Sequence, residues 1–168
     1  MATQLTNDRW DYESNCFVCE PTNPVGLQIP FSLTDDRHAV TAEFNLGSQH
    51  SSAPALVHSG VCLAILNEAQ QWAVVAIAAR WALTRSTECT FDGGVLIDHR
   101  HLVSARVTDI GHKLVHTEAS ILDEGGVELA RSHSSFTIVG IIDFDQHGHG
   151  LDPSHSGLLG DQQSPSAC

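Results

Sequence analysis

Positive charge is scarce in this sequence. Its 168 residues contain only eight Lys and Arg, of which Lys113 is the single lysine, against 20 Asp and Glu, so the formal net charge is −12. Binding to nucleic acid requires a basic footprint, as does docking on anionic lipid. The charge balance argues against both functions. It still permits an anionic small ligand, which a few local arginines can bind.

Long apolar runs are also absent, and we expect no secretory leader. No stretch approaches the ~20 apolar residues that span a bilayer. Residues 1–14 are polar and lack the apolar core of a secretory signal. We therefore expect a cytoplasmic protein without membrane contact.

The cysteines do not form a disulfide framework, because they are odd in number and scattered: Cys16, Cys19, Cys62, Cys89 and Cys168. Only Cys16 and Cys19 are close in sequence. A zinc site needs four ligands, and no second CxxC or HxxxH completes one. We interpret this pair as part of a structural loop, and Cys62 as a small buried apolar residue. The sequence predicts no metal and no cofactor.

Length and composition fit one domain with a sizeable core. Residues 1–15 are polar, and we expect them to be flexible. Residues 16–139 carry regular hydrophobic patterns and form the predicted domain. Residues 140–168 lose the pattern and are rich in Gly, Ser, His, Asp and Pro, which predicts a flexible C-terminal tail.

The patterns within the domain predict an antiparallel α+β fold. Residues 27–33 and 39–46 alternate like paired strands around a polar turn. Residues 56–79 are apolar nearly all round with helix formers throughout, which is typical of a buried helix. Four more strands are predicted, at residues 82–91, 101–110, 114–123 and 127–139. Strands that follow one another without intervening helices favour an antiparallel sheet, which must wrap a single buried helix.

The start of that helix is a candidate site. A short loop delivers His58, Ser59 and Gly60 to a helix N-terminus, where the first backbone N–H groups lack partners and the helix dipole is positive. Such an end can hold a carbonyl oxygen that is becoming an oxyanion. A simpler interpretation has Ser59 as an N-cap and Gly60 as a packing residue.

Polar residues inside the helix strengthen the functional interpretation. Asn67, Glu68, Gln70 and Gln71 interrupt the apolar segment, and a buried carboxylate is costly unless paired. His58 and Asn67 are nine positions apart, so on a helix they lie roughly 13 Å apart along the axis and point to roughly opposite sides. If both act on one substrate, a second subunit must supply one of them.

In order along the chain, several segments resemble those of the hotdog-fold acyl-thioesterases of the phenylacetate-degradation type, within the 4-hydroxybenzoyl-CoA thioesterase superfamily. CFVCEPTNPVGL resembles the CxxCxxxNPxGL opening of one bacterial branch. HSSAPALVHSGVCLAILNEA resembles its histidine-glycine-glycine loop and acidic helix, and LDEGGVELARSHSSFTIV its closing hairpin. Thr84, seven residues before Phe91, matches a Thr/Ser strand that precedes an aromatic residue. The resemblance covers about residues 16–139.

The resemblance implies a long central helix wrapped by a five- or six-stranded antiparallel sheet, assembled as a homodimer or dimer of dimers (a homotetramer). It implies hydrolysis of an acyl thioester at the dimer interface. By this resemblance, His58 orients the loop, the backbone N–H of Ser59 is the oxyanion donor, Gly60 is the second loop glycine, and Thr84 helps to place water. We expect the acyl group to contact side chains near these positions: Val57, Val61, Gln71, Trp72 and Phe91.

Asn67 departs from the family, which places its catalytic Asp or Glu there. An amide cannot act as a carboxylate base or nucleophile. Three hypotheses follow. Glu68 acts as the base after a small helix rotation, or Asn67 orients water in a slower hydrolysis, or the protein binds an acyl or aromatic ligand without hydrolysing it.

Asp92 is a second departure, because relatives often carry Arg-Pro near the phosphates of coenzyme A. An acidic Asp92 would repel phosphate, unless Arg85, Arg100 or Arg106 compensates. This leaves coenzyme A and the phosphopantetheine arm of a carrier protein as alternative substrate carriers. The latter would place the protein in polyketide or related secondary metabolism, with an aromatic or polyketide acyl group.

Overall fold

One helix and one large antiparallel sheet make up most of the molecule. A computed structural model describes residues 2–7 and 14–142. The helix α1 spans Ser59–Ala76. Seven strands form the sheet in the order β1-β2-β3-β7-β8-β9-β6. Their bounds are Thr3–Gln4 (β1), Ser32–Leu33 (β2), Val40–Phe44 (β3), Arg80–Phe91 (β6), His101–Ile110 (β7), Leu114–Leu122 (β8) and Glu128–Ile141 (β9).

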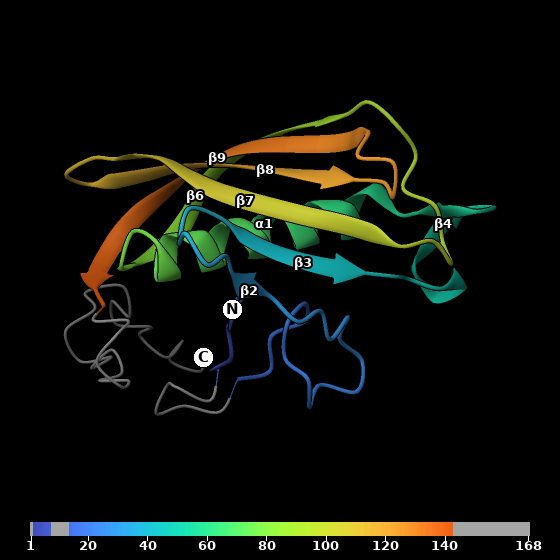
Figure 1. Cartoon of the computed structure of the whole chain (residues 1–168), viewed down its shortest axis with the longest axis horizontal. Coiled ribbons are helices and arrows are strands. Elements are labelled where there is room, and N and C mark those ends of the chain that lie inside the picture. Colours follow the sequence, from blue (N-terminus) through green and yellow to red (C-terminus); the bar gives the residue numbers. More distant parts are fainter. Residues whose placement is uncertain (1, 8–13, 143–168) are drawn as a thin grey trace, which may run out of the picture.

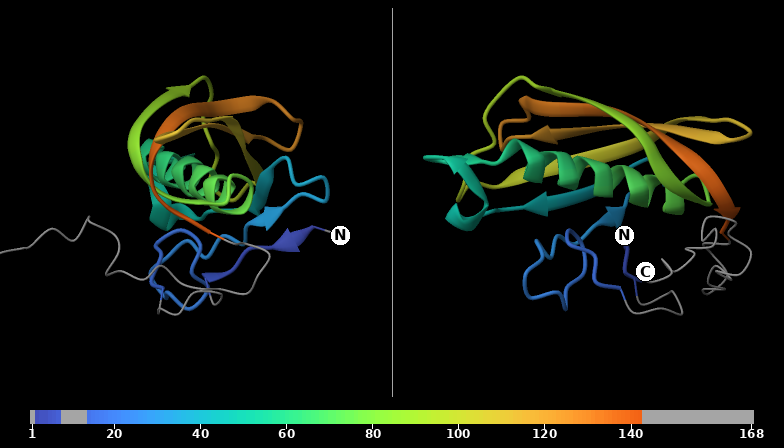
Figure 2. Two further views of the ribbon diagram at one scale, coloured as in Figure 1. Left: turned by 90° about the vertical axis from the view of Figure 1, so that its left-hand side faces the viewer. Right: turned by 180° about the vertical axis from the view of Figure 1, so that it is seen from behind.

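The sheet curves around α1, as the view along the helix in Figure 2 shows. The N-terminal segment, blue in Figure 1, lies on the side of the helix that the sheet leaves open. Side chains from both layers form the main core, including the fully buried Phe31, Ile65, Leu66 and Val103. Burial of these apolar side chains is the main force that holds the helix in the sheet.

The predicted α+β class with one buried helix in an antiparallel sheet is confirmed, but the predicted strand count of five or six is wrong. The sheet has seven strands because two very short ones, β1 and β2, extend it beyond β3. Within residues 27–33, only Ser32–Leu33 belong to the sheet. Residues 27 and 29 instead hydrogen-bond to the carbonyl groups of Phe17 and Val18.

The helix is shorter than the predicted 56–79. Leu56 and Val57 form the short strand β5, which pairs with β4 (Ser51–Ala53), and the N–H of Val57 donates to the carbonyl of Val95. These bonds keep residues 56–57 extended, so the helix begins at Ser59. At the other end, Ala79 adopts a positive φ of 53° that turns the chain into β6.

The chain outside the predicted domain also contributes structure. Within residues 1–15, which we expected to be flexible, β1 pairs with β2 and Leu5 is buried in the core. At the C-terminal end, β9 continues to Ile141, beyond the predicted boundary at 139. The rest of the predicted tail, residues 143–168, lies outside the described residues.

Among the described residues, no helix is both long and apolar enough to cross a membrane.

Candidate functional site

His58 caps the helix. Its Nδ1 accepts a hydrogen bond of 2.9 Å from the backbone N–H of Gly60. An accepting Nδ1 carries no proton, so the neutral imidazole holds its proton on Nε2. Glycine at position 60 leaves room for this cap, since a Cβ there would stand 3.1 Å from Nδ1, which is a tight contact. The N-cap is therefore His58 and not Ser59, as the simpler interpretation had it.

The cap decides which backbone N–H groups remain for a ligand. Gly60 donates to the imidazole, and Val61 and Cys62 donate to the carbonyl of His58. No described residue accepts from the N–H of Ser59, the first residue of α1, whose side chain is exposed. This N–H is the available donor at the positive end of the helix dipole.

Asn67 and Thr84 meet across the helix and the strand that follows it. The Thr84 hydroxyl donates to the carboxamide oxygen of Asn67 over 3.0 Å. One turn later, the amide of Gln71 donates to the carbonyl of Ala82 over 3.0 Å. These bonds fix the face of α1 against β6. Thr84 is exposed, because β6 is an edge strand whose partner in the described structure is β9.

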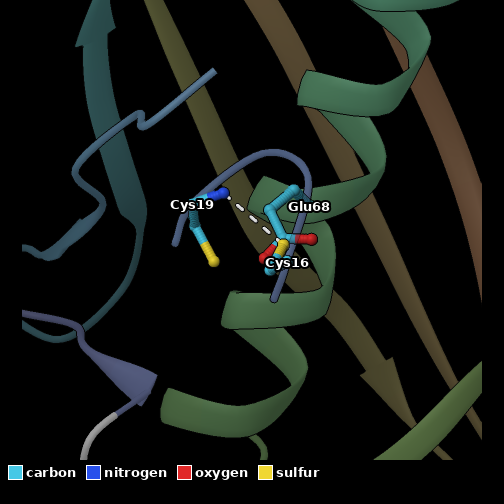
Figure 3. A group of neighbouring side chains, drawn as sticks. All are labelled: Cys16, Cys19 and Glu68. Carbon is cyan, nitrogen blue, oxygen red and sulfur yellow. Dashed lines mark hydrogen bonds between the residues drawn. The ribbon is translucent and has the colours of Figure 1, made fainter. Parts of the chain in front are cut away.

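Glu68 points toward the N-terminal segment and not toward Thr84. Its side chain lies under the N-terminal segment, beside the thiols of Cys16 and Cys19 (Figure 3). Burial, helped by the negative charge of the neighbouring Cys16, raises the pKa of the Glu68 carboxyl to about 7, although a hydrogen bond with Cys19 opposes the rise. The fold thus separates Asn67 and Glu68 by their direction, since consecutive helical residues differ by about 100°.

The five side chains predicted to contact an acyl group fall into different environments. Val57 is buried in the core, and Val61 is partly buried against it. Gln71 and Trp72 line a cavity of about 150 Å³ together with Glu68. Phe91, at the end of β6, is 45% exposed. The structure does not gather these residues into one pocket of a single chain.

The arginines considered as phosphate ligands are mostly paired. Arg100 lies 3.6 Å from Glu43, and Arg106 lies 2.6 Å from Glu118. Asp92 is itself paired, with Arg131 at 2.8 Å. That contact offsets part of the negative charge expected to repel a phosphate. Within the described chain, no ion pair involves Arg85, which is exposed on β6 next to Thr84.

No protein-family model matches the sequence. A comparison with curated proteins also found no match.

Solved structures are similar to the fold. A thioesterase superfamily protein matches with a TM-score of 0.69 and 15% identity, over 73% of this chain and 62% of its own. A hypothetical thioesterase from Streptococcus pneumoniae, solved with coenzyme A, matches with a TM-score of 0.60 and 10% identity, over 62% of this chain and 81% of its own. Zebra fish thioesterase superfamily member 2 matches with a TM-score of 0.62 and 16% identity, over 71% of this chain and 90% of its own.

These neighbours confirm the resemblance to the thioesterase superfamily at the level of the fold. The chain has the hotdog fold, in which an antiparallel sheet surrounds one long helix.

Proposed function

We propose that the protein is an acyl thioesterase, with Asn67 and Thr84 holding the attacking water and the N–H of Ser59 holding the thioester oxygen. The observation that carries this proposal is the Thr84–Asn67 hydrogen bond at an exposed strand edge. Asn67 and Thr84 stand where related enzymes place a carboxylate and a hydroxyl. The fold of the neighbours supports the same reaction class.

The proposed site needs two subunits. Ser59 and Asn67 are eight positions apart on α1, so one helix holds them roughly 12 Å apart. The edge strand β6 is 12 residues long and presents exposed backbone and the half-exposed Leu83 and Phe91. An exposed edge of this length is suited to pairing with a second chain. We propose a homodimer paired along β6, in which each helix start faces the Asn67 of the partner subunit.

The chemistry of this site is slow hydrolysis. Water attacks the thioester carbonyl carbon, the new oxyanion is stabilised by the N–H of Ser59, and collapse expels the thiolate as the C–S bond breaks. The carboxamide of Asn67 orients the water but takes no proton, so the proton passes to solvent. Glu68 stays outside this step, because its carboxyl faces Cys16 and Cys19.

The substrate carrier is coenzyme A or a phosphopantetheine arm. One neighbour was solved with coenzyme A, and the pairing of Asp92 with Arg131 reduces the repulsion that would oppose its phosphates. Substrates should be tested on both carriers, with aliphatic and aromatic acyl groups.

The decisive variant is Asn67→Asp, which restores a carboxylate beside Thr84. A general base contributes about 10²-fold or more, so we expect turnover to rise at least about tenfold. Asn67→Ala should lower turnover below that of the wild type. Unchanged turnover in both variants would contradict the site.

A second candidate function is binding of an acyl or aromatic ligand without hydrolysis. The amide at position 67 favours it, because this residue cannot serve as a base. Tight binding of an acyl thioester with no turnover on either carrier, together with activity gained in Asn67→Asp, would support this candidate.

A further inference from the structure

We propose that Cys16, Cys19 and Glu68 form a binding site for a zinc-class metal ion, which fastens the N-terminal segment to α1. One sulfur from each cysteine and one carboxylate oxygen of Glu68 lie within 4.8 Å of one another (Figure 3). Tetrahedral zinc holds thiolates at about 2.3 Å and carboxylate oxygens at about 2.0–2.2 Å. The three donor atoms are therefore close enough to surround one ion after small side-chain movements.

The backbone holds the first cysteine in a form suited to a metal. The N–H groups of Val18 and Cys19 donate to the sulfur of Cys16 over 3.4 and 3.5 Å. The amide of Asn7 donates to the sulfur of Cys19 over 3.3 Å. Hydrogen bonds to the sulfur favour the thiolate and orient it, as the outer contacts of metal ligands do.

A cation would stabilise the charged forms of these three acidic side chains. Glu68 is largely buried, and a buried carboxylate is costly unless it is paired. Arg100, Arg106 and Arg131 pair with Glu43, Glu118, Asp92 and Glu128, and not with Glu68. Two thiolates and a carboxylate would carry three negative charges, which a divalent ion reduces to one.

A fourth ligand has room to bind. Cys16 and Glu68 border the cavity of about 150 Å³, which Asn7, Ser14, Trp72 and others also line. The buried indole N–H of Trp72 lies near the Glu68 carboxyl but makes no hydrogen bond of regular geometry. A water molecule on the metal would fill the fourth position and could accept from this N–H. Three protein ligands and one water is a known zinc arrangement.

The two sulfur ligands select the type of metal. Thiolates favour zinc and similar soft or borderline ions over magnesium or calcium, which prefer oxygen. The site is separate from Asn67 and Thr84, so it does not depend on the thioesterase proposal. Its effect is to join residues 16–19 to the middle of α1, on the side that the sheet leaves open.

The test uses the full chain, purified under reductant, freed of metal with a chelator and titrated with Co²⁺ and then Zn²⁺. Cobalt bound by thiolates gives a near-ultraviolet charge-transfer band that histidine ligands do not give. This distinguishes the site from His147, His149 and His155, which lie near the C-terminus of the sequence. We expect one ion per chain, the thiolate band, and its loss on addition of Zn²⁺.

Variants assign the ligands. Cys16→Ser with Cys19→Ser should abolish the thiolate band, and Glu68→Gln should weaken Zn²⁺ binding at least about tenfold, as loss of a ligand charge does. Cys89→Ser is the matched control and should bind like the wild type. If the wild type shows no thiolate band at one equivalent of Co²⁺, the proposal is overturned, whatever the variants do. Equal affinity in wild type and Glu68→Gln would remove Glu68 from the site.

Discussion

The hydroxyl of Thr84 donates a 3.0 Å hydrogen bond to the carboxamide oxygen of Asn67. The bond leaves the amide nitrogen of Asn67 as a donor, so this residue presents N–H groups to a ligand. A carboxylate at position 67 would present only acceptors. The pair therefore differs from a catalytic acid in the groups that it offers to water.

Loss of the Thr84 hydroxyl should reduce turnover. Thr84→Val keeps the shape of the side chain but releases the carboxamide of Asn67. We expect kcat/KM to fall about tenfold, which corresponds to about 1.4 kcal/mol. Thr87→Val is the matched control, because Thr87 is on the same strand as Thr84 but its hydroxyl bonds with Ser134 of β9. Steady-state kinetics should show wild-type activity in the control, and an equal loss in both variants would contradict the role of Thr84.

Substitutions at His58 should separate its cap from its imidazole. His58→Ala removes the acceptor for the Gly60 N–H, and loss of an N-cap costs about 1 kcal/mol of unfolding free energy. His58→Asn supplies another good capping side chain and should preserve stability. Urea unfolding measures the free energy of unfolding of the two variants. A similar loss in the two variants would mean that capping is not what His58 contributes.

The oligomer should depend on β6. Leu83 lies on this edge strand and is 51% exposed. Leu83→Glu would bring two negative charges together in a dimer paired along β6, so we expect dissociation to monomers in light scattering after size exclusion. Ile110→Glu is the control, since Ile110 is 48% exposed on β7. A dimer that survives Leu83→Glu but not Ile110→Glu would place the interface elsewhere.

Cys62 should react slowly with thiol reagents up to high pH. Burial raises its pKa from 9.0 to about 11, and the thiolate is the reactive form. Because the folded pKa is above the unfolded one, the stabilising contribution of Cys62 is complete below pH 9 and is lost as the pH rises through 11. Mass spectrometry of the alkylated native protein should find Cys89, which is less buried, modified before Cys62. Rapid labelling of Cys62 at pH 8 would contradict this assignment.

Much of the fold could be predicted because its elements have regular periods. The predicted strand at residues 101–110 has the observed bounds of β7, and those at 82–91 and 114–123 differ from β6 and β8 by one or two residues. The start of the helix was placed too early, because apolar Leu56 and Val57 fit a helical pattern as well as a strand. Hydrogen bonds to β4 and Val95 hold these two residues as a strand, and the local sequence pattern does not predict such pairing.

The candidate site was predictable only where sequence neighbours or a family pattern defined it. His58, Ser59 and Gly60 are adjacent, and Thr84 was found from the resemblance. The third donor beside Cys16 and Cys19 was missed. A second cysteine pair or a histidine motif would be visible in the sequence, whereas Glu68 reaches the cysteine pair only through the fold, from the middle of the helix. In the sequence its signal is a carboxylate inside an apolar helix, which indicates a catalytic residue as readily as a metal ligand.

The connection between α1 and β6 has a consequence for the order of folding. Asn67 and Thr84 are 17 residues apart, on a helix and a strand that follow each other directly. Closing such a short loop costs little chain entropy, so this contact is expected to form early. Residues 16–19 must return over a much longer stretch of chain to reach Glu68. The N-terminal segment should therefore dock late, onto a helix and strand that already carry the Asn67–Thr84 pair.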